Sequence, residues 1–336
     1  MKTKVTKPKA VLISDIHYNV HTLALADAAM RQAIAKANEL QVPLIVAGDL
    51  HDTKANLRGE CINAMLETFK LCNQKPYILV GNHDRINEKS FEHSLNFLQA
   101  CANIIDGADR IKDGPYLIAY QHNPDICRAI LKACNTGAVV IMHQGLSGSN
   151  MGDYIQDKSA ITPEDVAGMR VISGHYHTRQ TIPLPKGGIW NYIGNPYTLG
   201  FGEANDPPKG YQILMEDRAL EFVPTSLRRH VVYNFPQPAV GGAALSCSSE
   251  DLLWVKVSGT KEYLANYNKR VINEVLNISF PYRLDLIPIE TLADTQIEHK
   301  DTQKQEDVLD SLIDSMANTS TERKERLKQT WKDLCE

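Results

Sequence analysis

Short apolar runs alternate with longer stretches of helical periodicity along the first half of the chain. Short runs of mostly apolar residues, bounded by Gly, Pro or polar residues, predict buried strands. The longer stretches, rich in Ala and Leu, predict helices. The pattern predicts strands at 9–14, 43–47, 76–80, 116–120, 137–142 and 169–173, and helices at 22–40, 58–73, 90–101 and 124–133. Strands that alternate with helices indicate a largely parallel, buried sheet with helical cover.

Beyond about residue 180 the pattern changes to consecutive strands, at 189–193, 211–215 and 220–223. This change predicts a second sheet packed on the first. Farther along, strands at 231–235, 252–258 and 282–288 with a helix at 262–276 predict a small α/β appendage. The expected fold class is therefore α/β, a two-sheet sandwich flanked by helices, followed by a small α/β cap domain.

The C-terminal part is polar and then amphipathic. Residues 291–306 have the composition of a linker, and apolar residues between Val308 and Met316 and between Leu327 and Leu334 fall at helical spacing. We expect a main domain, a cap domain, a linker and a helical segment, at residues 1–227, 228–290, 291–306 and 307–336. By pattern alone, the terminal helices either fold back on the body or bind a partner.

Composition restricts the function classes only in part. The net charge is −4 and 23% of the residues are charged, so a DNA-binding surface would have to be a local basic patch. Seven cysteines without a CxxC pair predict a reducing compartment and no disulfide framework or structural zinc site. No stretch approaches the length needed to span a membrane. We therefore expect a soluble, cytoplasmic protein.

Carboxylate, imidazole and amide side chains follow the ends of several predicted strands, where α/β sheets bind their ligands. Each segment alone is typical of a turn or a helix cap, but five in series indicate a metal site. A mixed oxygen and nitrogen set without Cys favours Mn, Fe or Zn. The number of candidate ligands favours two ions that share one carboxylate. The segments are Asp15-Ile16-His17, Gly48-Asp49-Leu50-His51-Asp52, Gly81-Asn82-His83-Asp84, Met142-His143 and Gly174-His175-Tyr176-His177.

This series resembles the signature of the calcineurin-like metallophosphoesterases, which reads DxH, GDxxD, GNHD, an isolated His and GHxH. The motifs span residues 15–177, about half of the chain. The resemblance implies the metallophosphoesterase fold with a two-metal site, and Mn²⁺ as the expected metal with Mg²⁺ as the alternative. It also implies ligands: Asp15, His17 and His177 for one ion, Asn82, His143 and His175 for the other, and Asp49 as the bridge.

The chemistry of a phosphodiester adds two catalytic candidates. Two divalent ions neutralise phosphate oxygens and lower the pKa of a water molecule, and the departing oxygen then needs a proton or charge stabilisation. His83 is the candidate for that role, because its neighbour Asn82 is an expected ligand. The resemblance implies that the Asp52 carboxylate orients His83, as the second Asp of GDxxD does in the family's phosphatases. The alternatives are a turn residue for His83 and a helix cap for Asp52.

The sequence after GHxH narrows the resemblance. Thr53-Lys54 and Asp84 depart from the GDxxDRG and GNHE patterns of the protein-phosphatase branch. The segments Asn191–Tyr197, Phe201-Gly202-Glu203 and Lys209-Gly210-Tyr211 resemble the SbcD family of DNA-repair nucleases, and most of all the recombination exonuclease subunits of phages. The resemblance implies a DNA exonuclease and endonuclease of repair and recombination, in the host cytoplasm if a phage encodes it. It also implies C-terminal helices that bind an SbcC-like coiled-coil ATPase.

The substrate is the main open choice. A positive face around Arg85, Lys89 and the cap would favour DNA, because phosphate contacts dominate DNA affinity, so both residues are candidate DNA contacts. A closed pocket lined by aromatic side chains would favour a small-molecule phosphodiesterase or a nucleotide pyrophosphatase. A non-catalytic scaffold for the ATPase is the third alternative, and the complete ligand set with His83 argues against it. A homodimer also stays open.

Overall fold

The structure, a computed structural model, describes most of the chain as far as residue 288. The described residues are 6–54, 56–87, 90–135, 137–150, 161–235, 247–265, 269–276 and 278–288, with Thr321, Lys324, Glu325 and Lys328. The chain divides into two compact units, Met1–Lys256 with Lys269–Asp285, and Val257–Asn268 with Leu286–Glu336. The predicted linker and nearly all of the predicted terminal helices lie outside the described residues, so those expectations stay predictions.

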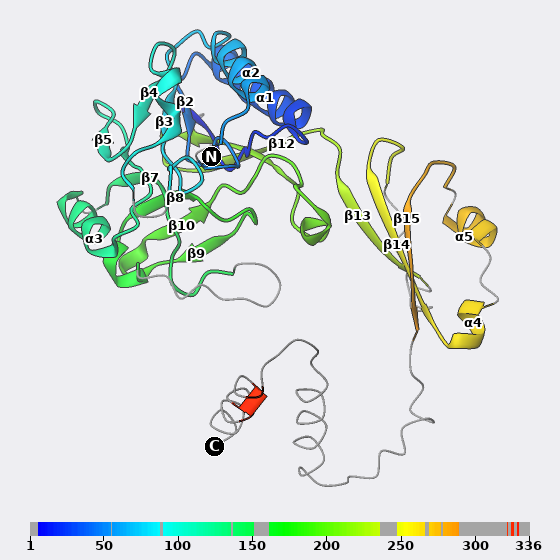
Figure 1. The fold of residues 1–336 in the computed structure, drawn as a ribbon. Helices are drawn as coiled ribbons and strands as arrows, with labels where there is room; N and C mark the ends of the chain where they lie inside the picture. The colour runs from blue at the N-terminus through cyan, green and yellow to red at the C-terminus, as the bar shows by residue number, and fades with distance from the viewer. Residues whose placement is uncertain are drawn as a thin grey trace, which may run out of the picture. The chain divides into compact units, whose positions relative to one another are not determined.

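The first sheet has six strands in the order β12-β11-β1-β2-β3-β4 (Figure 1). Strands β1 to β4 pair in parallel, and β11 and β12 extend the sheet antiparallel from β1. The bounds are β1 Pro8–Ile13, β2 Leu44–Val46, β3 Tyr77–Leu79, β4 Asn103–Ile105, β11 Gly210–Met215 and β12 Leu220–Pro224. Parallel pairing brings the carboxyl ends of β1, β2 and β3 to one edge of the sheet.

The second sheet also has six strands, in the order β5-β6-β7-β8-β10-β9. The four central strands are parallel, and an antiparallel strand closes each edge. The bounds are β5 Ala108–Arg110, β6 Tyr116–Ile118, β7 Val139–His143, β8 Arg170–Gly174, β9 Thr181–Pro183 and β10 Ile189–Tyr192. Strands β7 and β8 end in His143 and Gly174, so this sheet delivers the other predicted site segments.

Alternation along the strands divides the core into three layers. In β1, Leu12 belongs to the core between the sheets with Ile45 and Ile141, while Val11 belongs to the core under the helices α1 (Leu23–Leu40) and α2 (Gly59–Phe69). This follows from the period of two along a strand. Helix α3 (Pro124–Ala133) covers the second sheet through Cys127 and Leu131. The predicted two-sheet α/β sandwich flanked by helices is confirmed (Figure 1).

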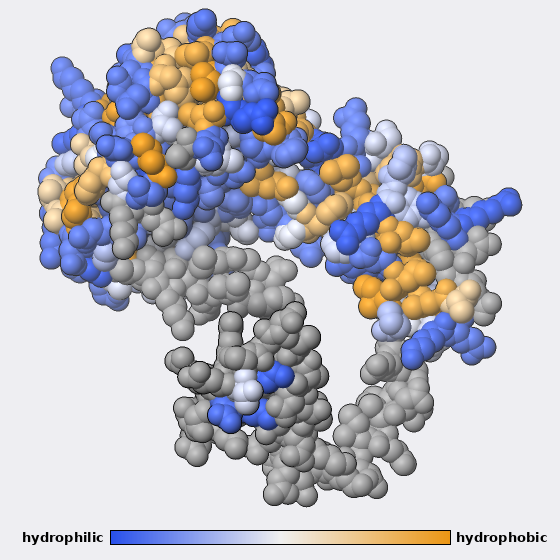
Figure 2. Space-filling view, in the orientation of Figure 1, coloured by the Kyte–Doolittle hydropathy of each residue, from blue (hydrophilic) through white to orange (hydrophobic). Residues whose placement is uncertain are grey.

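A third sheet, of order β13-β14-β15, follows the sandwich along the chain. Its strands are β13 His230–Phe235, β14 Leu252–Gly259 and β15 Arg283–Pro288. The helix predicted at 262–276 is described as two helices, α4 Lys261–Ala265 and α5 Lys269–Leu276. Large apolar side chains stay exposed here, among them Leu252, Leu286 and Ile287 at 38%, 44% and 40%. Figure 2 shows the corresponding hydrophobic surface over this part of the chain.

Some predicted elements differ from the structure. The helix predicted at 90–101 is wrong, because only a short 3₁₀ helix, η1 (Ser94–Leu98), forms there. Tertiary contacts hold the residues before it in a non-helical conformation: Arg85 and His93 form an antiparallel bridge, and the Arg85 guanidinium donates to the Ser90 carbonyl. The short strands β4, β5 and β9 were not predicted.

The structure also bears on membrane-spanning helices and on the cysteines. Within the part of the chain that the structure describes, no helix is long and apolar enough to cross a membrane. The six cysteines in that part are free, as expected for a chain without a disulfide framework.

Candidate metal centre and active site

The predicted site segments converge at the carboxyl ends of the parallel strands, and they do so on unusual backbone. Asp15, His17, Asp49 and His175 have positive φ angles of 54°, 50°, 50° and 91°. A non-glycine residue in this region costs roughly 1–3 kcal/mol, and such residues gather where function requires them. Four of the seven predicted ligands therefore share a conformation that packing alone does not favour.

Two motif glycines allow the segments to approach one another. A side chain on Gly48, whose φ is 94°, would collide with the His143 ring. A side chain on Gly81 would collide with the backbone and carboxylate of Asp49. Glycine is the residue that tolerates both a left-handed backbone and such close contact. These two positions therefore let the loops after β2 and β3 lie against each other and against the end of β7.

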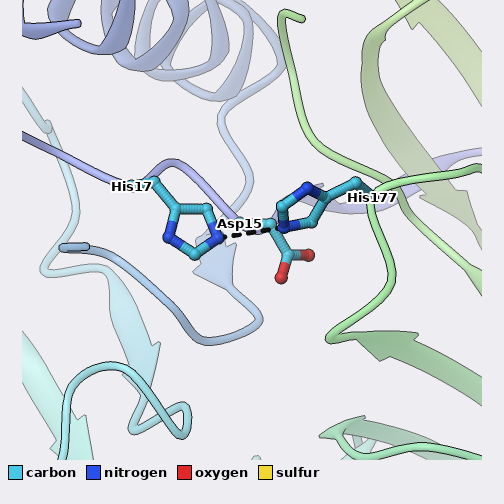
Figure 3. Close-up of side chains that lie close together, drawn as sticks. All are labelled: Asp15, His17 and His177. Atoms are coloured by element: carbon cyan, nitrogen blue, oxygen red, sulfur yellow. Dashed lines mark hydrogen bonds between the residues drawn. The ribbon is translucent and has the colours of Figure 1, made fainter. Parts of the chain in front are cut away.

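The first candidate cluster consists of Asp15, His17 and His177, whose possible ligand atoms all lie within 4.8 Å of one another. The Nε2 atoms of His17 and His177 face each other at 3.1 Å, with the Asp15 carboxylate beside them (Figure 3). On its far side, His177 Nδ1 donates to Glu203 Oε1 at 2.7 Å. We call Asp15, His17 and His177 cluster A.

The second candidate cluster, which we call cluster B, consists of Asn82, His143 and His175. Asn82 Oδ1 lies 3.0 Å from His143 Nε2 and 2.9 Å from His175 Nδ1. Asp49 lies between the clusters: its Oδ2 is 3.3 Å from His143 Nε2 and 3.9 Å from His17 Nε2. All seven predicted ligands are therefore brought together, and Asp49 has the position expected of a bridging ligand.

The hydrogen bonds behind the imidazoles show that both clusters fit cations. His143 Nδ1 donates to the Ala47 carbonyl at 2.8 Å, so Nε2 of the neutral ring turns a lone pair toward Asn82 Oδ1 and Asp49 Oδ2. His177 Nδ1 donates to Glu203, so its Nε2 likewise turns a lone pair toward His17. Acceptors that face one another in a buried site repel unless a proton or a metal ion lies between them. Neutral imidazole with carboxylate and amide oxygen is a donor set for Mn, Fe or Zn.

The pKa values of His143, Asp49 and His175 reflect the charge at the centre and its burial. Burial by itself lowers the pKa of His143, but the Asp49 carboxylate outweighs it and raises that pKa to about 9. Burial opposes ionisation of Asp49, yet the adjacent His143 holds the pKa of that carboxyl well below its usual range. Burial lowers the pKa of His175 to about 4, and His143 beside it acts in the same direction. The centre thus attracts positive charge while His175 stays neutral and able to bind a metal.

His83 lies at the open side of the centre, with 35% of its side chain exposed. Its backbone N–H donates to Asp49 Oδ1 at 2.8 Å, and its ring centroid lies 4.9 Å from that of His17. The ring is oriented by Asp52 through the backbone, since Nδ1 donates to the Asp52 carbonyl at 2.8 Å. The Asp52 carboxylate, predicted to orient His83, lies within ion-pair distance, with Oδ1 3.9 Å from His83 Nδ1. It lies closer to His17, with Oδ1 3.4 Å from Nδ1, and the direct hydrogen bond to His83 comes from the Asp52 carbonyl instead.

Asp84 braces the loop after β3. Its carboxylate is fully buried and accepts backbone N–H groups from Leu50, His51 and Gly81 at 3.0, 3.2 and 2.8 Å. These bonds tie the loop that carries Asn82 and His83 to the loop that carries Asp49. Asp84 therefore has a structural role beside the centre.

Arg85 is not a surface residue, contrary to the prediction that it contacts DNA. Only 2% of it is exposed, and its guanidinium donates to the carbonyls of Ser90 and Tyr120 at 3.1 and 2.6 Å. Burial lowers the pKa of Arg85. The side chain therefore joins backbone segments inside the protein. Lys89, the other predicted contact, lies outside the described residues.

Glu203 is a residue at the site to which the sequence analysis assigned no role. It lies in the short 3₁₀ helix η4 (Phe201–Glu203), and its side chain contacts His177. Burial opposes its ionisation, but the hydrogen bond from His177 and the charge of Lys209 lower its pKa to about 2. The FGE and KGY segments were visible in the sequence, but only the fold brings them behind the GHxH segment.

A cavity of about 340 Å³ opens over the centre and is lined by Asn82, His83, His175, Glu203 and Asp206, among others. A larger cavity of about 630 Å³ is lined by Lys9, Arg110, Tyr116 and Val139, and none of the predicted site residues borders it. Cavity size therefore does not indicate the active site here. The convergence of ligand-type side chains does.

A family model matches the part of the chain that carries this geometry. The family model described as calcineurin-like phosphoesterase matches residues 8–179, slightly more than half of the 336 residues. The protein named "Putative phosphoesterase 244L", of Invertebrate iridescent virus 6, is 27% identical over 239 residues, 63% of this chain and 82% of that protein. A solved structure of a dimetal phosphatase from Danio rerio matches 66% of this chain and all of that chain, at 11% identity and a TM-score of 0.43. The chain belongs to the calcineurin-like phosphoesterase family, and it is a metal-dependent phosphoester hydrolase.

Proposed function

We propose that this chain is a metal-dependent DNA nuclease, an exonuclease and endonuclease that hydrolyses phosphodiester bonds with two divalent ions, Mn²⁺ before Mg²⁺. One observation carries the proposal. Two ligand clusters share Asp49, and the half-exposed His83 lies beside them at the mouth of the cavity. A two-ion centre with an adjacent imidazole suits in-line displacement at a phosphodiester.

Cluster A would hold one ion and cluster B would hold the other. Asp49 would contribute to both sites. When bound, the ions supply neutralisation of the phosphate charge and a lowered pKa for the attacking water. The chain's own residues then have three tasks. The loops after β2 and β3 fix the ligands, Asp84 keeps those loops together, and the outer-shell acceptors Ala47 and Glu203 orient the imidazoles.

His83 is assigned to the departing oxygen. Its Nδ1 is engaged by the Asp52 carbonyl, so Nε2 is the nitrogen available to a substrate in the cavity. A protonated ring there would donate the Nε2 proton to the leaving oxygen. The backbone hydrogen bond from His83 to Asp49 fixes this ring beside the shared carboxylate. Because the orienting group is a carbonyl, the ring position depends on the backbone of Asp52 more than on its carboxylate.

Two features support DNA over a small molecule. Tyr176 is the one aromatic residue besides histidines among the described residues that line the cavity, so an enclosing aromatic wall is absent from that part of the site. The third sheet also carries cations around an indole: Lys256 Nζ lies 4.0 Å and Arg283 Cζ 3.9 Å from the Trp254 ring centroid. Arginine and lysine beside an aromatic ring are typical of surfaces that bind the phosphate backbone.

The proposed partner is an SbcC-like coiled-coil ATPase bound through residues 307–336. Its support is the resemblance of the segments after GHxH and the amphipathic pattern of this part of the sequence. Deleting residues 304–336 should leave hydrolysis of bis-p-nitrophenyl phosphate unchanged and abolish co-purification with the ATPase. A truncated chain that still captures the ATPase would refute the assignment of the terminal helices.

The test of the function is an assay of the purified chain with Mn²⁺ on duplex DNA, single-stranded DNA and bis-p-nitrophenyl phosphate, with and without the ATPase. A nuclease cleaves DNA and the model diester, and His83→Ala loses both activities. Nucleotide pyrophosphates and p-nitrophenyl phosphate serve as comparison substrates. Efficient turnover of these with no cleavage of DNA would favour the small-molecule alternative.

A further inference from the structure

Glu203 has its whole carboxylate engaged behind cluster A. Its Oε1 accepts from His177 Nδ1 at 2.7 Å, and its Oε2 accepts from Asn195 Nδ2 at 3.0 Å and from the Leu199 backbone N–H at 2.9 Å. Lys209 Nζ lies 3.4 Å from the same Oε2. With 16% of its side chain exposed and this many partners, the carboxylate has one available orientation, and that orientation fixes the His177 ring.

The residues behind Glu203 are themselves fixed. Lys209 donates to Asp206 Oδ2 at 2.6 Å and to the His177 carbonyl at 3.0 Å, and only 9% of its side chain is exposed. Asn195 is buried, and its backbone N–H donates to the same His177 carbonyl at 3.2 Å. The backbone and the ring of His177 are thus held by one connected group of residues from the segment that follows the GHxH motif.

The two clusters differ in what lies behind their imidazoles. In cluster B, His143 donates to a neutral backbone carbonyl, that of Ala47. In cluster A, His177 donates to the Glu203 carboxylate, and the Asp52 carboxylate lies 3.4 Å from His17 Nδ1. A carboxylate behind a ligating imidazole fixes its tautomer and raises its basicity as a ligand more than a neutral acceptor does.

We propose that Glu203 is a positioning residue for His177, and that carboxylate support makes cluster A the tighter of two unequal cation sites. The inference rests on the proposed two-cation centre, and it adds which site binds first and which residue decides it. Glu203 does not touch the substrate in this role. It acts through the orientation and the protonated Nδ1 of His177.

The test is a titration of the full chain with Mn²⁺. Calorimetry and electron paramagnetic resonance measure the binding at each step. The wild-type chain should bind two ions in two resolvable steps. Glu203→Gln keeps the shape but removes the charge, and it should weaken the tighter step by about 10–100-fold, the usual effect of losing an outer-shell partner, while the weaker step is unchanged. Glu203→Asp should recover part of the loss. Glu216→Gln, an exposed carboxylate beside Lys9, is the matched control and should bind as wild type does.

A second measurement separates positioning from general structure. In the metal-free chain, nitrogen-detected imidazole spectra should show His177 protonated at Nδ1, and Glu203→Gln should turn this single tautomer into a mixture while the melting temperature stays near that of wild type. Equal weakening of both Mn²⁺ steps, or no weakening, overturns the inference. A wild-type chain that binds fewer than two ions overturns it as well. A chain that shows the predicted steps but does not cleave DNA refutes the nuclease function and leaves this inference supported.

Discussion

Clusters A and B each contribute two imidazoles and share Asp49, yet their third ligands and their surroundings differ. Cluster A has the Glu203 and Asp52 carboxylates behind its imidazoles. Cluster B has the Ala47 carbonyl behind His143, and it has the Asn82 amide in place of a carboxylate of its own. The two clusters therefore share Asp49 and a pair of imidazoles each, and they differ in the third ligand and in the groups behind the imidazoles.

The difference matters because charge around a metal ion decides both its affinity and the acidity of a bound water. Cluster A combines Asp15 with two supporting carboxylates, whereas cluster B depends on neutral groups and on the shared Asp49. We expect A to retain its ion and B to exchange its ion more readily.

The largest effect is expected at His83, which belongs to neither cluster. His83→Ala should lower the hydrolysis rate of bis-p-nitrophenyl phosphate by about 10²–10⁴-fold, because general acid catalysis contributes that much. Both Mn²⁺ steps should persist. Exposed His122 provides the control, since it does not line the cavity over the centre. If the His83→Ala chain binds fewer ions, the His83 ring is itself a ligand. The ligand sets of clusters A and B would then have to be assigned again.

Asp49→Asn should weaken both Mn²⁺ steps, each by more than about 100-fold, which exceeds the usual loss from an outer-shell change. The reason is that one oxygen of Asp49 lies within 4 Å of imidazoles from both clusters. The titration used for Glu203→Gln measures it. If Asp49→Asn weakens a single step, the carboxylate is not shared and the two sites are independent.

Asp84→Ala should destabilise the metal-free chain by about 3 kcal/mol or more, because it leaves three buried backbone N–H groups without an acceptor. Urea unfolding without Mn²⁺ measures the loss. Asp109→Ala, at an exposed position of β5, is the control and should change stability little. The substitution should weaken Mn²⁺ binding at cluster B more than at cluster A, since Asp84 lies in the loop that carries Asn82. Unchanged stability would mean that other contacts hold the loops together.

The smallest effects separate a buried arginine from an exposed one. Arg85→Met should lower stability by about 1–3 kcal/mol without changing the salt dependence of DNA binding, because the guanidinium satisfies buried carbonyls.

Arg283→Gln should leave stability nearly unchanged and lower the salt slope of DNA binding by about one, as expected for one lost phosphate contact. Filter binding across a salt series measures the slopes. Identical slopes for Arg283→Gln and wild type would remove the third sheet from the DNA-binding surface.

The sequence was sufficient for the sandwich because strand periodicity is a local rule, and the family resemblance pointed to the side chains that the fold brings together. Leu12 and Val11 take opposite sides of β1 by the period of a strand, and Asp15, Asn82 and His143 come directly after or at the ends of predicted strands. Parallel pairing brings the ends of β1, β2 and β3 to one edge of the first sheet. Packing of the second sheet against the first then adds His143 from the end of β7.

The sequence was insufficient where long-range contacts decide the outcome. Arg85 looked like a surface charge, yet carbonyls from two other segments bury it. Asp52 orients His83 with its carbonyl, a choice that residue type cannot reveal. Glu203 contacts a histidine that is 26 residues earlier in the chain, through a loop whose path only the fold defines.

The sharing of Asp49 by two cations has a direct spectroscopic test. Electron paramagnetic resonance of the wild-type chain with increasing Mn²⁺ should show a first uncoupled ion and then, as the second site fills, the broadened spectrum of two exchange-coupled ions. Asp49→Asn should remove the coupling. A spectrum that stays that of isolated Mn²⁺ at two bound ions per chain, or saturation at one ion, would contradict the account.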